Sequence, residues 1–492
     1  MPMLKLVTRT KFALAAAGVL AAGGGAVACA TNPVTGKSQI SLVSEAQEIQ
    51  MGQEANQSIQ AQMGLVQDPA LQSYVSNLGK TLAANSERPN LPWEFHVVDD
   101  PIVNAFALPG GFIYVTRGLL SHVNNEAELV SVLGHEIGHV TYRHSVSQIS
   151  KQQLAGLGLG IGSILSPTVA RFGNIAAGGL QLLFLKYGRD AERESDLAGF
   201  RYSLQEGYDV REMASVFNTL SRVGQLEGGG GGGVPSWLST HPDPESRAEL
   251  AIARADSLSP GNRGTKVNRE EYLQRIQGLT FGEDPRQGYF DGGTFYHPGM
   301  RFQFTVPQGW QTQNTAQAVL AGSPQQDALF QMTLGQGTPQ AAAQRFFSQQ
   351  GLQAAEVGNT TINGNQAVSG YFQAQTEQGV LRGLATFVGY GGGTFMLLGY
   401  APAERFASYD ATFRQTMGSF RQLTDQSRIN VQPAKVELVR LTRAMSLEEF
   451  YRQYPSTVPI ERIAVINEVE AGAQLQAGRS YKRVVGGMGT TN

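Results

Sequence analysis

Two histidines four residues apart, His135 and His139, restrict the fold of this chain more than any other feature of its sequence. They lie in a stretch that begins at Asn125 and has Glu128 three residues later, an arrangement typical of a helix start. The pattern predicts that this helix continues through about residue 144. Because residues four apart share one face of a helix, the fold has to present both imidazoles on the same side.

The residues from the first histidine to the second form the pattern His-Glu-x-x-His, in which Glu136 follows directly after His135. The chain has only 7 histidines among 492 residues, so chance rarely produces this pattern. Two imidazoles on one helix face can bind a zinc ion, and Glu136 then lies beside a metal-bound water that it can deprotonate. The alternative is a buried helix with two hydrogen-bonded histidines. We predict one zinc ion per chain, with His135 and His139 as ligands and Glu136 as general base.

A catalytic zinc needs a third protein ligand, and the composition limits which residue supplies it. The chain has no second cysteine beside Cys29, so the ligand must be His, Glu or Asp. Downstream, Glu192 and Asp196 are four residues apart in a strongly helix-forming stretch and share a face, whereas Glu194 lies about 200° round the helix. Glu192 is predicted to bind zinc, while Asp196 accepts the free N–H of a zinc-bound histidine. The alternative is a solvated, charged helix face.

The first 28 residues have the pattern of an export signal, with a positively charged start, an uncharged stretch over residues 12–28 and small residues before Cys29. The site resembles a bacterial lipoprotein processing box, in which the cysteine is lipidated. We predict a signal peptide at 1–28 and a periplasmic protein anchored to the outer membrane through Cys29. The alternative is ordinary cleavage and a soluble periplasmic protein. The net charge of −2 indicates no polybasic surface, so no nucleic-acid partner is expected.

The chain is too long for one hydrophobic core, and the pattern predicts an α+β protein of several domains. Strands are predicted at 93–98 and 111–116. Residues 436–485 weakly resemble a lysin motif, because their predicted order is strand, helix, helix, strand. Shifts in composition and turn signals predict a tether at 29–40, a mainly helical domain with a short sheet at 41–256, a polar connector at 257–292, an α+β domain of unknown role at 293–423, and the lysin-motif-like module at 436–485.

Four motifs resemble those of the zinc metallopeptidases that include the HtpX heat-shock proteases and the CAAX prenyl endopeptidases, and they follow one another along the chain in the order found in that family. In chain order they are the stretch 104–115, the HExxH pattern, the pair Glu192 and Asp196, and the run 239–242 around His241. The stretch 104–115 and the run 239–242 are similar to the periplasmic, BepA-like branch of this family. The resemblance covers about residues 30–256 and implies a mainly helical zincin metallopeptidase domain. It implies zinc ligands at His135, His139 and Glu192, a general base and proton donor at Glu136, and a residue behind the ligands at Asp196.

The resemblance implies roles for two further residues. His241 matches a histidine that can occupy the fourth zinc position in the BepA-like branch and hold the enzyme latent, and Arg247 matches an arginine that steadies the developing oxyanion. Six glycines at 228–233 precede His241 and predict a flexible hinge; the alternative is an ordinary loop histidine. The glycine-rich apolar stretch 154–185 is expected to cover the site rather than to span a membrane. The remaining histidines are expected to be structural or surface residues: His96, His122, His144 and His297.

A turn at residues 109–111 followed by an apolar run predicts an exposed edge strand close to the active-site helix. Such a strand holds an extended peptide by main-chain hydrogen bonds, with little sequence selectivity. The alternative is an ordinary internal strand. The residues assigned to the edge strand are Gly111, Phe112, Ile113 and Tyr114.

Together these features predict a zinc-dependent endopeptidase of the bacterial envelope that cleaves unfolded or misassembled periplasmic and outer-membrane proteins. One alternative is an assembly factor or chaperone that cleaves rarely and works with the outer-membrane assembly machinery. A second is a cell-wall hydrolase, for which the lysin-motif-like module would bind peptidoglycan.

Overall fold

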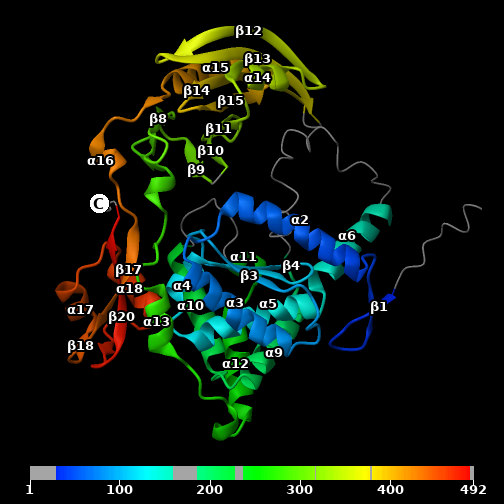
Figure 1. The fold of residues 1–492 in the computed structure, drawn as a ribbon, viewed down its shortest axis with the longest axis vertical. Helices are drawn as coiled ribbons and strands as arrows, with labels where there is room; N and C mark the ends of the chain where they lie inside the picture. Colours follow the sequence, from blue (N-terminus) through cyan, green and yellow to red (C-terminus); the bar gives the residue numbers. More distant parts are fainter. Residues whose placement is uncertain (1–28, 159–185, 228–236, 316, 377–378, 488–492) are drawn as a thin grey trace, which may run out of the picture.

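The computed structural model describes residues 29–158, 186–227, 237–315, 317–376 and 379–487 (Figure 1). The predicted signal peptide, most of the apolar stretch 154–185 and the glycine run 228–233 lie outside these residues. A helical body with a short sheet occupies one end of the molecule, and an antiparallel sheet with two helices occupies the other (Figure 1). The α+β character predicted from the sequence is confirmed.

The helical body is built around α5, because α3, α9, α10 and the small sheet pack against it. Its first turn is capped by Asn125, whose side chain accepts from the Glu128 backbone N–H. The predicted helix end is three residues too far: α5 stops at Thr141, and Arg143, with φ of 58°, turns the chain into a new helix. The helices are α2 (Glu45–Met63), α3 (Pro69–Ala84), α4 (Arg117–His122), α5 (Glu126–Thr141), α6 (His144–Gly158), α9 (Arg189–Gln205), α10 (Glu212–Glu227), α11 (Trp237–Thr240), α12 (Pro244–Ser257) and α13 (Arg269–Ile276).

The small sheet has the order β3 (Glu94–Val98), β5 (Phe112–Thr116), β4 (Ala105–Leu108). β3 pairs parallel with β5, and β4 pairs antiparallel with β5. The prediction of an edge strand at Gly111, Phe112, Ile113 and Tyr114 is therefore wrong. β4 and β5 form a hairpin through Gly110 and Gly111, both with positive φ, and β3 then occupies the other side of β5. β5 is buried along its whole length, and the edge strand that packs along α5 is β4.

Residues 289–422 contain a seven-stranded antiparallel sheet in the order β12-β13-β14-β15-β11-β10-β9 and a four-stranded antiparallel sheet in the order β16-β8-β7-β6. Two helices pack on the seven-stranded sheet, α14 (Pro339–Phe347) and α15 (Ala403–Gly418). The strands are β6 (Tyr289–Asp291), β7 (Thr294–His297), β8 (Phe302–Thr305), β9 (Gln311–Asn314), β10 (Ala318–Gly322), β11 (Leu329–Gly335), β12 (Leu352–Ile362), β13 (Asn365–Thr376), β14 (Gly379–Tyr390), β15 (Gly393–Pro402) and β16 (Arg421–Gln422).

The last unit has the expected order, with β17 (Ala434–Arg440) paired antiparallel to β20 (Ser480–Gly486) and α17 (Leu447–Gln453) and α18 (Ile460–Ile466) between them. A short pair, β18 (Met445–Ser446) and β19 (Gln474–Leu475), completes it. This unit shares one buried cluster with the helical body. The segment expected to be a polar connector takes part in that contact, because Tyr272, Leu273 and Ile276 of α13 are buried in the same cluster.

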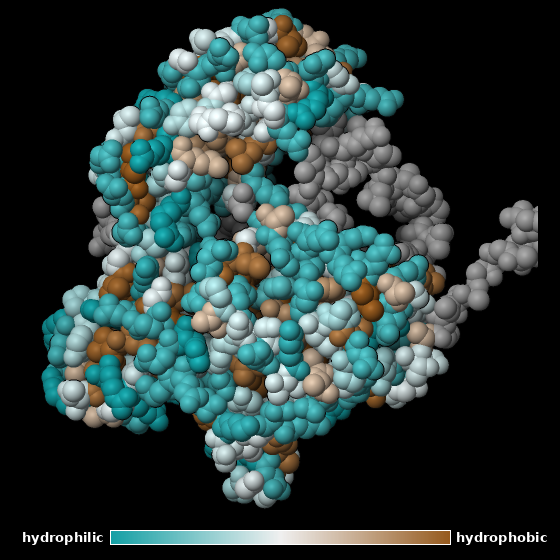
Figure 2. Space-filling view, viewed as in Figure 1, coloured by the Kyte–Doolittle hydropathy of each residue, from teal (hydrophilic) through white to brown (hydrophobic). Residues whose placement is uncertain are grey.

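The expected tether forms a short hairpin of β1 (Cys29–Thr31) and β2 (Ser38–Ile40). Its turn is attached to the helical body, since the Asn32 side chain donates to the Tyr142 carbonyl at 3.1 Å. Among the described residues, none of the helices is both long and apolar enough to cross a membrane. The face seen in Figure 2 is mostly hydrophilic, with hydrophobic side chains scattered over it.

Candidate metal centre

Four buried side chains from three segments converge beside α5: His135, His139, Glu192 and His241. The His135 and His139 Nε2 atoms are 3.0 Å apart, and His241 Nδ1 lies 3.3 Å from His135 Nε2. Glu192 Oε1 is 3.1 Å from His241 Nδ1 and 3.5 Å from His139 Nε2. The structure thus brings together the two helical histidines, the downstream glutamate and the histidine of the 239–242 motif.

The arrangement of these four side chains fits a zinc ion. A tetrahedral zinc site with ligand distances of about 2.0–2.1 Å holds its ligand atoms roughly 3.3 Å apart, close to the separations seen among these four side chains. Burial lowers the pKa of His135 to about 4 and that of His139 well below its ordinary value, so both rings are neutral. His135 Nδ1 faces the Asp196 carboxylate, which places a lone pair on His135 Nε2. A cation relieves the repulsion between lone pairs that converge in this way.

Asp196 lies behind His135, as predicted, with its Oδ1 2.9 Å from His135 Nδ1. Arg247 holds this carboxylate in a bidentate pair, donating from Nε at 2.8 Å and from Nη2 at 2.6 Å. Although burial opposes the shift, Arg247 lowers the pKa of Asp196 below its usual range. The Arg247 guanidinium also lies 2.9 Å from Glu192 Oε2 and over the Phe217 ring. In this structure Arg247 therefore orients two acidic residues of the site.

Glu136 points into the same cluster, with its Oε1 3.7 Å from His241 Nε2. This oxygen has no hydrogen-bond partner among the described residues. Burial raises the pKa of Glu136 to about 7. A carboxyl group with these properties is suited to accept and return a proton at neutral pH.

Two aromatic rings fix the orientation of the imidazoles. Tyr187 stacks on His139 with ring centroids 4.0 Å apart, and Trp237 stacks on His241 at the same distance. Trp237 is itself anchored, because its backbone N–H donates to the Val103 carbonyl beside β4. Neither ring was predicted to belong to the site. Each lies five or fewer residues before an acidic or histidine ligand, but only the fold shows that the rings stack.

The helices that carry the ligands approach closely because glycines line their contact. A Cβ on Gly138 would lie 2.9 Å from Ser195 Cα, and one on Gly134 would lie 2.9 Å from Gly199 Cα. α5 and α9 therefore pack backbone to backbone at this point. The short separation places Glu192 within reach of both helical histidines.

His144 and Glu194 lie behind His139, away from the converging donors. His144 was expected to be a structural or surface residue, and its Nδ1 is 3.0 Å from His139 Nδ1. Glu194 faces away from the converging donors, as expected, but its Oε2 is 3.0 Å from His144 Nε2. The other histidines lie away from the cluster: His96 contacts Glu94, His122 contacts the Gly118 carbonyl, and His297 accepts from the Met300 N–H.

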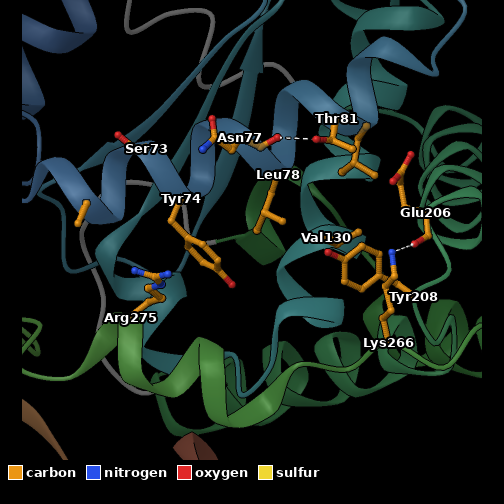
Figure 3. Close-up of a pocket in the computed structure, with 12 residues that line it drawn as sticks. Ser73, Tyr74, Asn77, Leu78, Thr81, Val130, Glu206, Tyr208, Lys266 and Arg275 are labelled. Carbon is orange, nitrogen blue, oxygen red and sulfur yellow. Dashed lines mark hydrogen bonds between the residues drawn. The ribbon is translucent and has the colours of Figure 1, made fainter.

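A cavity of about 540 Å³ lies on another side of the helical body, between α3 and residues 206–208, 266 and 275 (Figure 3). Tyr74, Tyr208, Lys266 and Arg275 surround it in the close-up. The residues that line it do not include the converging ligands. The chemistry of the molecule is therefore centred on the buried cluster.

Comparison with known proteins places this cluster in a family. The model of peptidase family M48 matches residues 69–255, a range that contains all four converging residues. The chain is 32% identical over 264 residues to the beta-barrel assembly-enhancing protease of Yersinia pestis, covering 51% of this chain and 52% of that protein. It is 31% identical over 245 residues to the mitochondrial metalloendopeptidase OMA1 of Schizosaccharomyces pombe, covering 47% of this chain and 68% of that protein.

The match spans about half the length of the beta-barrel assembly-enhancing proteases. It falls on the helical body, where the sequence motifs and the ligand geometry agree. The resemblance inferred from those motifs is confirmed, and the chain belongs to peptidase family M48.

Proposed function

We propose that this protein is a zinc-dependent endopeptidase of the bacterial envelope that acts on misfolded or misassembled periplasmic and outer-membrane proteins. The observation that carries the proposal is the convergence of His135, His139 and Glu192 on one buried point, with Glu136 beside them. The family match and the two relatives named above support a metalloendopeptidase.

The residues of the chain divide the work of hydrolysis. His135, His139 and Glu192 would hold a zinc ion, which when bound would polarise the peptide carbonyl and make a water molecule more acidic. Glu136 takes the proton of the attacking water on its free carboxylate oxygen and then delivers it to the leaving amine. Asp196 and Arg247 keep His135 and Glu192 in the orientation that this requires. Stabilisation of the oxyanion by Arg247, expected from the resemblance, remains a prediction.

His241 is proposed to hold the enzyme latent. Its Nδ1 lies among the three other donor atoms, in the place where a catalytic site keeps a position for water. A site closed by four protein ligands is typical of structural zinc, whereas hydrolysis needs one open position. Displacement of His241 is therefore expected to precede cleavage.

An extended peptide is proposed to bind along β4, the sheet edge beside α5. Main-chain pairing at an edge strand accepts many sequences, which suits a protease for misassembled chains. Lipidation of Cys29, outer-membrane location and contact with the assembly machinery belong to the same proposal.

Casein digestion tests the proposed reaction. The wild-type protein is expected to cleave casein slowly, and the His241→Ala variant is expected to cleave it faster. Glu136→Gln or a chelator should abolish cleavage. Glu249→Gln, which alters an exposed carboxylate on α12, is the matched control and should cleave like wild type. Cleavage that survives Glu136→Gln contradicts the mechanism. If neither the wild-type protein nor His241→Ala cleaves casein or peptidoglycan, while Glu136→Gln still supports envelope assembly, the assembly-factor alternative is favoured.

A further inference from the structure

A row of polar side chains runs from His139 away from the metal cluster towards the surface. His139 Nδ1 is 3.0 Å from His144 Nδ1, and His144 Nε2 is 3.0 Å from Glu194 Oε2. His144 is buried, whereas the Glu194 side chain is 44% exposed. The proposed reaction uses neither residue.

Metal binding leaves only one arrangement of hydrogens along this row. A metal on His139 Nε2 needs the lone pair of that nitrogen, so the ring proton lies on His139 Nδ1. That N–H donates to His144 Nδ1, which therefore carries no proton. His144 then bears its proton on Nε2 and donates it to the Glu194 carboxylate. Each contact has one donor and one acceptor, and the carboxylate at the end fixes the direction of both.

The chain bends in an unusual way to place His144 behind His139. Arg143 adopts φ of 58°, a left-handed conformation that is uncommon for residues other than glycine. It is held there because its Nε donates to Glu48 Oε2 at 2.9 Å and its Nη2 donates to the Val43 carbonyl at 3.0 Å. Backbone conformations of this kind persist where the surroundings enforce them, often at functional sites.

The two helical histidines are thus supported differently. His135 contacts the Asp196 carboxylate directly, and that carboxylate is paired with Arg247. His139 reaches its carboxylate through a second imidazole. Partners of this kind fix the tautomer and the ring orientation of a metal-bound histidine and raise its basicity.

We propose that His144 and Glu194 are positioning residues that hold His139 as a metal ligand, through the hydrogen-bonded row His139, His144, Glu194. This inference rests on the proposed zinc site. It concerns residues that do not themselves contact the metal, and it assigns a task to the histidine that follows the left-handed turn.

Zinc affinity at constant pH, measured by competition with a chromophoric chelator, tests the proposal. His144→Phe keeps a ring beside Tyr142 but removes both nitrogens, and the zinc dissociation constant should rise about 10- to 100-fold. His144→Asn restores an acceptor near His139 Nδ1 and should recover most of the affinity. Glu194→Gln keeps an acceptor without the charge and should give a smaller loss. Asp190→Asn, on the same helix with a side chain 98% exposed, is the control and should bind zinc like wild type.

The thermal midpoint of each metal-free variant separates positioning from folding. The account expects His144→Phe and His144→Asn to unfold at similar temperatures and to differ in zinc affinity. Equal zinc affinity in His144→Phe and wild type would overturn it, as would equal weakening in His144→Phe and His144→Asn. Absence of zinc binding in the wild-type protein would instead contradict the proposed metal site itself.

Discussion

His241 is proposed to act both as a metal ligand and as an inhibitor of the site. It contacts Glu192 through Nδ1 and approaches Glu136 through Nε2, so it would separate the proposed general base from a water bound to the metal. Stacking on Trp237 supports it in this place. In the proposed mechanism, cleavage therefore depends on whether the His241 imidazole occupies the metal site or has left it.

Replacement of His241 by alanine is predicted to increase casein cleavage by about ten-fold or more, since the competent form no longer competes with a closed one. Zinc content should stay at one ion per chain, because His135, His139 and Glu192 remain. His297→Ala, which changes a histidine outside the cluster, serves as control. Unchanged or lower cleavage with normal zinc content would refute the latch.

The sequence predicted those site residues whose spacing along the chain places them on one face of a helix. His135 and His139, like Glu192 and Asp196, are separated by one helical turn, and the structure places each pair on one helix face turned to the cluster. The contacts of His144 with His139 and Glu194 were not predicted. They depend on the left-handed turn at Arg143, which no local pattern of residue types reveals.

Among the elements, the contact of α5 with α9 decides whether a metal site exists. Gly134 and Gly138 on one helix and Gly199 on the other allow backbones to meet, which no larger residue permits. The helices themselves follow from local signals, such as the cap at Asn125. The order of the small sheet does not. β4 and β5 are both buried at every residue, so their residue types do not show which of them lies in the middle, and only tertiary packing puts β5 there.

Gly138→Ala is predicted to push α9 away from α5, because the added methyl group would lie 2.9 Å from Ser195 Cα. Overpacking of this kind costs about 1–3 kcal/mol of unfolding free energy, more than the gain in helix propensity. Zinc affinity should fall as well, since Glu192 moves with α9. Denaturant unfolding and chelator competition measure the two effects. Gly418→Ala, at the last position of α15 with open space around it, should lower neither; loss of stability in both variants alike would argue against close packing as the cause.

For the whole molecule, the C-terminal unit is joined to the helical body through a buried lysine. Lys482 Nζ donates to the carbonyls of Ser121 at 3.0 Å, His122 at 3.3 Å and Val123 at 2.9 Å, at the end of α4. The order of elements in this unit was predicted from the sequence. Its docking could not be predicted, because no local pattern shows that a lysine in a short strand is buried against carbonyls that lie about 360 residues earlier in the chain.

Burial lowers the pKa of Lys482 to about 7, with Glu468 and Glu128 opposing the shift and Arg269 adding to it. The ordinary value is 10.5, so between about pH 7 and 10.5 the unfolded chain binds more protons than the folded one. The free energy of unfolding of wild type should therefore rise relative to Lys482→Met, by about 2–3 kcal/mol from pH 7 to pH 9.5. Urea unfolding at several pH values measures this difference. Lys435→Met, which changes an exposed lysine, serves as control, and its free energy of unfolding should change with pH as that of wild type does. A difference in unfolding free energy between wild type and Lys482→Met that stays constant with pH would contradict a lowered pKa of the buried amine.

The most direct test of the account as a whole is zinc K-edge X-ray absorption of the purified full chain, with metal content measured on the same sample. The account predicts one zinc per chain, coordinated by four nitrogen or oxygen atoms of which three belong to imidazoles. In His241→Ala the imidazole count should fall to two, while the coordination number is kept by water. Wild-type protein without zinc, or with only two imidazoles at the metal, would contradict a site closed by His135, His139, Glu192 and His241.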